Sequence, residues 1–350
     1  MCQLRYVGVV LSLSAVVGLS ACGGGGSSGP PPPNPLYVSA RTGSDTNLGD
    51  QSHPLGSVAA AGRLALNGYK VIVGSGTYRD GVTPPAEGAA PHGVQYIADV
   101  SGTLTGDPPG PVVIDASLSS VQAGFKLNSS AGTLIDGFTI TGAADAGIVL
   151  KSSSDNSTIQ NCIIHDNSGD GIRVQDSAYV LVFNNLVYNS GGNGIGIAGN
   201  TSGSKNSTVV NNTVYGSSGY GIAIGTTTTA SPAAFVRNNI LQNNSASGNI
   251  KVTSQPTARS EVNYQGDYNL VYAPDKYIGP QGISGAHDIH VDARFVNASG
   301  GDFHVTANSP AIDAGDPNLD ASLANALRSR TTTGTGLDTG RIDVGFHYSP

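Results

Sequence analysis

The segment Gly171-Ile172-Arg173-Val174 recurs along the chain at nearly constant spacing. The first five copies begin 23, 24, 23 and 27 residues apart. The six copies are Gly124-Phe125-Lys126-Leu127, Gly147-Ile148-Val149-Leu150, Gly171-Ile172-Arg173-Val174, Gly194-Ile195-Gly196-Ile197, Gly221-Ile222-Ala223-Ile224 and Asn249-Ile250-Lys251-Val252. Two apolar residues, two positions apart, follow the first residue of every copy, which is the alternation of a β-strand.

A second apolar series runs in phase with the first. Its members are Leu134-Ile135-Asp136-Gly137-Phe138, Ile159-Gln160-Asn161-Cys162-Ile163, Val182-Phe183-Asn184-Asn185-Leu186, Val209-Val210-Asn211-Asn212-Thr213 and Phe235-Val236-Arg237-Asn238-Asn239-Ile240. Each repeat therefore holds about three short strands, which is too little for a propeller blade and lacks the helices of ankyrin or tetratricopeptide units. Because so thin a unit cannot bury its own apolar face, we predict that successive coils stack on one another.

Stacking predicts vertical rows of inward side chains, since alternate strand residues point to the same face. The rows are Phe125, Ile148, Ile172, Ile195, Ile222 and Ile250, and Leu127, Leu150, Val174, Ile197, Ile224 and Val252. Asn185, Asn212 and Asn239 share one turn position, where asparagine tolerates a left-handed backbone and amides can hydrogen-bond along the column. We assign the repeated glycines to bends where the chain turns sharply or requires a positive φ.

The composition narrows the possible classes of protein. The 350 residues include 49 Gly and no Trp, and 12% of them are charged, about half the usual share. Coiled coils, long helical bundles and polyampholytic disordered chains are excluded, because they need many charged residues or alanines. A net charge of −7 argues against a nucleic-acid partner, which would require clustered lysines and arginines.

The N-terminus predicts an exported protein. Arg5 precedes the apolar stretch 6–19, and Leu19-Ser20-Ala21-Cys22 resembles the lipobox of bacterial lipoproteins. The resemblance implies a signal peptide over 1–21, lipidation of Cys22, and a Gly/Ser/Pro tether over 22–35. The alternative is an ordinary secretory signal that contains a cysteine. Gly23, rather than Asp, after Cys22 fits sorting to a Gram-negative outer membrane, so we expect an extracytoplasmic protein held at a membrane through its lipid alone.

The repeat resembles the right-handed parallel β-helix proteins of the pectate-lyase-like superfamily. Val71-Ile72-Val73 resembles their entry segment, an amphipathic stretch over 57–66 predicts a short helix capping the open end, and Ser309-Pro310-Ala311-Ile312-Asp313-Ala314-Gly315 resembles their closing segment. The resemblance covers residues 36–350, with repeats over about 112–272 and a C-terminal cap over about 285–350. It implies one all-β domain, which we expect to be a monomer. The superfamily includes lyases, hydrolases, epimerases and adhesins, so it leaves the activity open.

In enzymes of this superfamily the substrate lies along the outward face of the first sheet. The outward columns place Lys126, Lys151 and Arg173 within about 10 Å of one another, with Asp145 and Asp170 on the turns before two of these strands. Such a cluster suits β-elimination on a uronic-acid polysaccharide. There a cation neutralises the sugar carboxylate and acidifies the neighbouring C–H group, and lysine or arginine removes the proton.

We therefore predict Arg173 or Lys151 as the catalytic base. Lys126, Gln175 and Asn128 are predicted to bind the substrate. Asp145 and Asp170 are candidate ligands for Ca²⁺, because this ion prefers oxygen ligands.

The alternative is a non-catalytic polysaccharide-binding or adhesive surface protein, since outward residues of a solvated sheet are polar in any case. Tyr179, Tyr188, Tyr215 and Tyr220 are candidates for stacking on sugars at the rim of this face.

Three other patterns are interpreted as structural. The glycine-rich stretch 194–199 matches a dinucleotide fingerprint but opens no helix. The sequence around Asp45 lacks most ligands of a calcium loop and is expected to be a turn. His287 and His290 would point to opposite faces of a strand, so a shared metal is not predicted.

Overall fold

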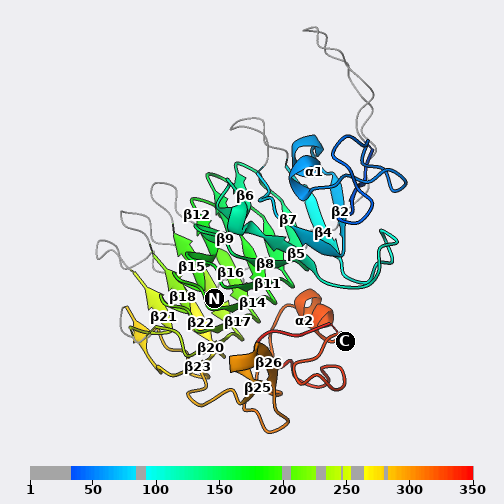
Figure 1. Ribbon diagram of the computed structural model, residues 1–350. Coiled ribbons are helices and arrows are strands. Elements are labelled where there is room, and N and C mark those ends of the chain that lie inside the picture. The colour runs from blue at the N-terminus through cyan, green and yellow to red at the C-terminus, as the bar shows by residue number, and fades with distance from the viewer. Residues whose placement is uncertain are drawn as a thin grey trace, which may run out of the picture. The chain divides into compact units, whose positions relative to one another are not determined.

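Short parallel strands wind through three sheets in the computed structural model, which describes residues 33–83, 92–198, 206–225, 234–245, 247–253, 264–279 and 283–349. Neighbouring strands in a sheet come from successive coils, so they lie about one repeat apart in the sequence. Figure 1 shows the coils stacked in chain order from the N-terminal to the C-terminal end. The parallel β-helix predicted from the repeat is confirmed.

Over the described residues each sheet contains one strand from each coil that contributes to it. Sheet A comprises β1 (Leu36–Val38), β2 (Lys70–Gly74), β4 (Gln95–Asp99), β7 (Leu134–Asp136), β10 (Thr158–Gln160), β13 (Leu181–Phe183), β16 (Ser207–Val210), β19 (Ala234–Arg237) and β22 (Tyr264–Asp267). Sheet B comprises β3 (Gly76–Tyr78), β5 (Val112–Asp115), β8 (Thr139–Thr141), β11 (Ile163–His165), β14 (Leu186–Tyr188), β17 (Thr213–Tyr215), β20 (Ile240–Gln242) and β23 (Leu270–Tyr272). Sheet C comprises β6 (Ala123–Asn128), β9 (Ala146–Lys151), β12 (Asp170–Gln175), β15 (Ile195–Ala198), β18 (Ile222–Ile224), β21 (Ile250–Val252) and β24 (Tyr277–Ile278).

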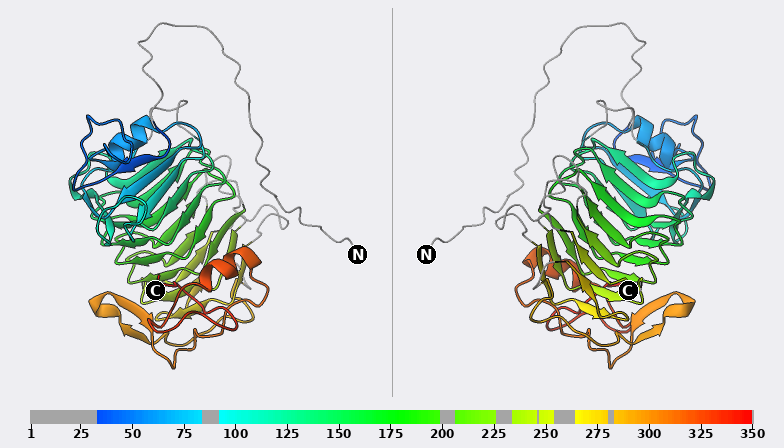
Figure 2. Two further views of the ribbon diagram at one scale, coloured as in Figure 1. Left: turned by 90° about the vertical axis from the view of Figure 1, so that its right-hand side faces the viewer. Right: turned by 90° about the vertical axis from the view of Figure 1, so that its left-hand side faces the viewer.

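A short helix caps the N-terminal end, as predicted. Helix α1 (Val58–Leu64) begins after Ser57, whose side chain accepts a hydrogen bond from the backbone N–H of Ala60 at 3.1 Å. This contact satisfies one of the N–H groups that a helix start leaves unpaired. The helix buries Val58 and Ala61, and Figure 2 shows it at the N-terminal end of the stack.

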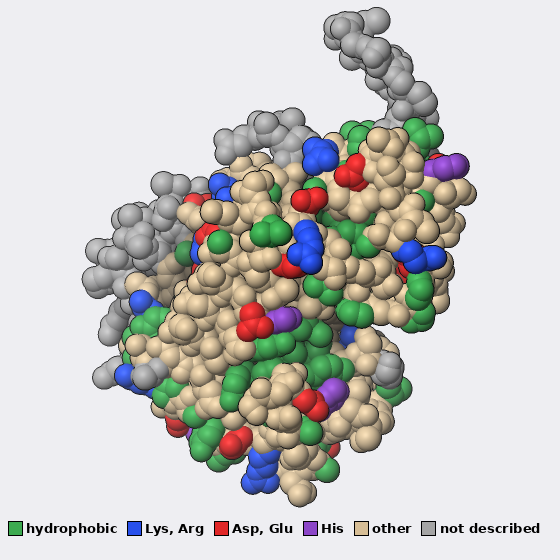
Figure 3. All heavy atoms as spheres, viewed as in Figure 1, with side chains coloured by type: hydrophobic (Ala, Val, Ile, Leu, Met, Phe, Trp, Pro, Cys, Tyr) green, Lys and Arg blue, Asp and Glu red, His purple; other side chains and the backbone are tan. Residues whose placement is uncertain are grey.

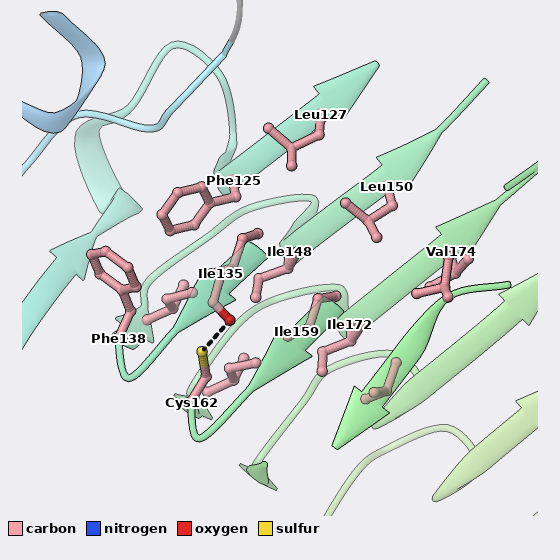
Figure 4. Packing of buried hydrophobic residues seen from close by; sticks show 14 of the residues in the cluster. Phe125, Leu127, Ile135, Phe138, Ile148, Leu150, Ile159, Cys162, Ile172 and Val174 are labelled. Carbon is pink, nitrogen blue, oxygen red and sulfur yellow. Dashed lines mark hydrogen bonds between the residues drawn. The ribbon is translucent and has the colours of Figure 1, made fainter. Parts of the chain in front are cut away.

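The predicted inward rows form the core. Phe125 and Ile148 of one row and Leu127 and Leu150 of the next have no exposed surface, and Figure 4 shows them pointing between the sheets. Burying one such aliphatic side chain stabilises the fold by about 1.5–3 kcal/mol. Stacking therefore supplies the apolar burial that one repeat lacks.

The repeated glycines at the starts of the sheet C strands serve close packing, and the positive φ that was one of the two reasons predicted for them is not observed. Gly171 and Gly194 do not have a positive φ. A Cβ at Gly171 would lie 2.3 Å from Val187 Cγ1 and 2.7 Å from the carbonyl oxygen of Gly194. Gly124 and Gly147 are equally crowded, by Ile or Gly atoms at 2.5–2.9 Å. The column recurs because only glycine lets sheet C approach sheet B so closely.

Substituting alanine for Gly171 is expected to destabilise the protein by about 3 kcal/mol, because overpacking a tight core displaces backbone as well as side chains. Urea unfolding followed by circular dichroism measures the loss. Gly110 is the matched control: a Cβ there would meet only Ser75, at 3.4 Å or more, and its alanine variant should unfold like the wild type. Equal stabilities for the two variants would refute this explanation of the glycine column.

The predicted asparagine ladder is present and longer than expected. Asn185 Nδ2 donates to Asn212 Oδ1, Asn212 Nδ2 to Asn239 Oδ1, and Asn239 Nδ2 to Asn269 Oδ1, each at 3.0 Å. The left-handed backbone belongs to the preceding residue instead, for example Asn211 with φ 54°. In each asparagine pair, the first residue therefore adopts the left-handed backbone and the second forms the ladder hydrogen bond, although both roles were predicted for the second residue.

The C-terminal segment packs on the outer faces of sheets A and B. It contains the antiparallel hairpin β25 (Phe295–Asn297) and β26 (Asp302–Val305), and helix α2 (Ala321–Leu327). Leu327 packs with Phe183 and Val210 of sheet A, and Phe303 packs with Leu186 of sheet B. Two 3₁₀ turns, Ala116–Leu118 and Ala298–Gly300, complete the described elements.

The predicted signal peptide 1–21, Cys22 and most of the tether 22–35 lie outside the described residues. Residues 32–350 form one compact unit. Among the residues that the structure does describe, no helix has the length and apolar character needed to cross a membrane.

Candidate functional site

The outward face of sheet C brings together the predicted basic residues. Lys126, Val149 and Arg173 pair in register across β6, β9 and β12, and Asn128, Lys151 and Gln175 form the next column. Neighbouring coils lie about 4.8 Å apart, so Lys126 and Arg173 are two coils apart in one column. The C-terminal segment packs on sheets A and B, away from these strands.

Arg173 is held by two carboxylates from different coils. Its Nη1 donates to Asp145 Oδ1 at 2.6 Å, and its Nε donates to Asp170 Oδ2 at 2.9 Å. Asp170 is itself fixed, because its Oδ1 accepts hydrogen bonds from the backbone N–H and the side-chain amide of Asn193. The guanidinium therefore bridges Asp145, the residue before β9, and Asp170, the first residue of β12.

These two ion pairs oppose the predicted role of Arg173 as the catalytic base. Burial opposes the charged form of Arg173, but the hydrogen bonds and charges of Asp170 and Asp145 outweigh it and raise the pKa of the guanidinium. A group held as a cation by two carboxylates is poorly placed to accept a proton.

The same contacts decide how well a calcium ion fits. Ca²⁺ takes six to eight oxygen ligands, whereas Asp145 and Asp170 direct their carboxylates to Arg173. As placed, these two residues do not fit a calcium ion, because the guanidinium stands where the ion would have to lie.

Lys126 and Lys151 differ from Arg173 in having no ion pair among the described residues. Both side chains are half-buried, and within the part of the chain that the structure describes neither Lys126 nor Lys151 has an ion-pair partner. On a protein with a net charge of −7, they form a local positive patch, which we call the lysine patch. Asp145 and Asp170, which hold Arg173, belong to the same face, so the charge of the patch comes from Lys126 and Lys151 alone.

A hollow of about 370 Å³ lies at the N-terminal end of this face, between α1 and the segment before β6. Its lining includes Arg63, Asp80 and Val121. Val121 also packs with Val149, which lies between Lys126 and Arg173 in the outward column. Neither Lys126 nor Lys151 lines the hollow, which meets the sheet C face through Val121.

The predicted rim tyrosines are split between two faces. Tyr188 and Tyr215 lie on sheet B with ring centroids 4.9 and 5.2 Å from that of Phe303, so they are covered by the C-terminal hairpin. Tyr220 lies beside sheet C, with Lys251 Nζ 5.0 Å from its ring centroid. Tyr179 is exposed. The assignment of Tyr188 and Tyr215 to the rim is wrong, because alternation along one strand says nothing about what packs over it.

The turn at Asp45 and the strand within 194–198 are confirmed, whereas His287 and His290 belong to no named strand, so the predicted alternation does not apply to them. Asp45 accepts hydrogen bonds from the backbone of Gly56 and Ser57 ahead of α1, as a turn residue does. His287 pairs with Asp267 and His290 with Asp275, so the two imidazoles have separate partners. The stretch 194–198 leads into and forms strand β15 of sheet C.

One cluster in the described residues has the composition of a metal site, namely Asp338, Asp343 and His347. All three are buried, and both imidazole nitrogens are engaged: Nε2 with Asp338 Oδ2 at 2.8 Å and Nδ1 with the Gly345 carbonyl at 2.9 Å. Asp343 accepts hydrogen bonds from the Asp313 backbone and the Thr332 hydroxyl. We interpret this network as a set of buried hydrogen bonds that orders the C-terminal segment.

The family described as right handed beta helix region matches residues 107–263, and no curated protein matches the chain. Solved structures that resemble it include pectate lyase Pel9A (15% identity over 91% of this chain and 97% of that one, TM-score 0.41), a rhamnogalacturonan lyase (12%, 87% and 99%, 0.39), and a lacto-N-biosidase from Eubacterium ramulus (12%, 68% and 56%, 0.47). The family match spans coils of all three sheets, and the chain is a right-handed parallel β-helix protein.

Proposed function

We propose that the protein binds an acidic polysaccharide along the outward face of sheet C and cleaves it by β-elimination. The observation that carries the proposal is the lysine patch, where Lys126 and Lys151 project from adjacent strands without carboxylate partners among the described residues. Because the whole protein is acidic, only a local concentration of positive charge favours a polyanion there.

The contacts favour Lys151 over Arg173 as the base. In the proposed step Lys151, a cation when the polymer binds, first gives its own proton to water, and the amine then takes the proton from the carbon that bears the uronate carboxylate. The electron pair left on that carbon forms a double bond to the adjacent carbon, whose bond to the glycosidic oxygen breaks. The departing oxygen takes up a proton from water. Lys126 lies one coil away and would stabilise the negative charge that develops on the carboxylate.

Arg173, Asn128 and Gln175 would position the polymer. Asn128 and Gln175 flank Lys151 in the same outward column and carry amides suited to sugar hydroxyls. Arg173 would offer its remaining N–H donors to the polymer while Asp145 and Asp170 hold its orientation. No step is derived through calcium, and adding a chelator to the assay tests the predicted calcium requirement.

The test is an assay on polygalacturonate, alginate and a glycosaminoglycan. A lyase produces unsaturated uronate ends, which absorb in the ultraviolet, in proportion to chain cleavage. New reducing ends without that absorbance would identify a hydrolase and overturn β-elimination. Retention of the polymer without cleavage would favour the alternative, a binding or adhesive protein that uses the same face.

We also infer that Cys22 carries a lipid anchor, as the lipobox-like segment 19–22 suggests. Labelled palmitate is expected to be incorporated into the protein in a bacterial host, and a Cys22→Ser variant is expected to lose the label and appear in the soluble fraction. Equal labelling of both proteins would place the lipid on another residue, and labelling of neither would support an ordinary secretory signal.

A further inference from the structure

A separate cleft of about 410 Å³ opens at the corner between sheets A and B. This volume lies in the range of small-molecule sites, roughly 300–1,000 Å³. Ile97, Asp136 and Asn161 of the solenoid line one wall, and Arg330 and Phe346 of the C-terminal segment line the other. Figure 3 shows the surface notched between the N-terminal coils and the C-terminal segment. The cleft exists only because that segment folds back along the solenoid.

Arg330 is a half-buried cation in this cleft. Its Nη1 donates to Ser349 Oγ at 3.0 Å, and among the described residues its guanidinium has no carboxylate within ion-pair distance. Burial lowers the pKa of Arg330, and the charge of Asp136 opposes that effect only in part. A partly desolvated guanidinium with most of its donors unused is complementary to a carboxylate, which it can bind through two parallel hydrogen bonds.

The facing wall suits hydroxyl groups. Asp136 accepts hydrogen bonds from Gln160 Nε2 at 2.9 Å and from Asn161 Nδ2 at 2.7 Å. These amides fix the carboxylate and leave it further acceptor capacity, since two oxygens carry about four lone-pair sites. Ile163 and Phe346 supply apolar surface nearby, as the C–H face of a sugar ring requires.

We propose that this cleft binds one acidic sugar residue, with the carboxylate on Arg330 and the ring hydroxyls on the Asp136 wall. A neutral sugar offers Arg330 only hydroxyl oxygens and no carboxylate, and a simple carboxylate offers Asp136 no hydroxyl group. The proposal takes the class of ligand from the proposed function but uses different residues. The cleft would hold acidic polysaccharide at a second point, around the corner from the lysine patch.

The test is isothermal titration of the protein with D-galacturonate, D-glucuronate, D-galactose and acetate. At least one uronate is expected to bind at least tenfold more tightly than galactose or acetate, and less tightly as salt is raised. Arg330→Gln is expected to weaken uronate binding at least tenfold, and Arg330→Lys severalfold, because lysine keeps the charge but loses the planar fork. Arg328→Gln, an exposed change in the same segment, should leave binding unchanged.

Three results would overturn the cleft proposal: no binding of either uronate, equal affinity for galactose, or wild-type affinity in Arg330→Gln. Thermal melts check that each variant is folded. If Arg330→Gln does not fold, the loss of uronate affinity in Arg330→Lys tests the proposal instead. Lys151→Ala separates this proposal from the first, because it should lower cleavage at least about a hundredfold and leave uronate titration intact. Cleavage without uronate binding would support the sheet C proposal and contradict the cleft proposal. Uronate binding without cleavage would support the cleft proposal and contradict the sheet C proposal.

Discussion

Lys151→Ala is expected to lower kcat on the acidic polysaccharide by about a hundredfold to ten-thousandfold, the usual contribution of a positioned general base. The expectation rests on the contrast on sheet C between Arg173, which two carboxylates hold as a cation, and Lys151, for which the structure describes no ion pair. Initial rates from the ultraviolet absorbance of unsaturated ends give kcat and KM separately.

Lys151→Arg distinguishes a base from a mere positive charge. Arginine preserves the charge that attracts the polymer but is very difficult to deprotonate, so KM should stay close to the wild-type value while kcat falls. Lys70→Ala, on the exposed start of β2 in sheet A, is the matched control and should retain full activity. Full activity in Lys151→Ala would exclude this residue as the base.

Asn212→Leu is expected to destabilise the fold by about 4 kcal/mol, although leucine is close to asparagine in size. Asn212 is fully buried, and its amide accepts from the Asn185 backbone and side chain and donates to the Val182 carbonyl. Leucine leaves these buried groups without that partner, and each such loss costs about 1–3 kcal/mol.

Urea unfolding measures this cost. Asn308→Leu is the matched control, because Asn308 is exposed and an exposed substitution of this kind usually changes stability by less than about 0.5 kcal/mol. A comparable loss in both variants would show that the ladder amides contribute no more than surface asparagines do.

The coils could be predicted because their constraints are local and repeated. Ile148, Ile172 and Ile195 occupy equivalent positions, so each copy confirms the inward direction of the others. The asparagine ladder follows from the same register. The cause of the glycine column could not be predicted, since its crowding comes from Val187 on another sheet rather than from the backbone of Gly171 itself.

For the candidate site, too, one part could be predicted from the sequence and another could not. Alternation placed Lys126, Lys151 and Arg173 on one outward face, and the register confirms that arrangement. Alternation could not show that Asp145 and Asp170 would both turn to Arg173, because the path of a turn is not periodic. The roles of these residues in binding and catalysis stay predictions.

The repeat in the sequence alone was sufficient for the parallel coils, their inward rows and their basic outward face, because stacking identical units leaves one way to bury the apolar residues. The tertiary structure decided which charges pair and where the C-terminal segment packs. It brings Arg330 and Asp136 to one cleft although they lie far apart in the chain. Contacts between such distant segments depend on the shapes of both surfaces, and no local pattern records them.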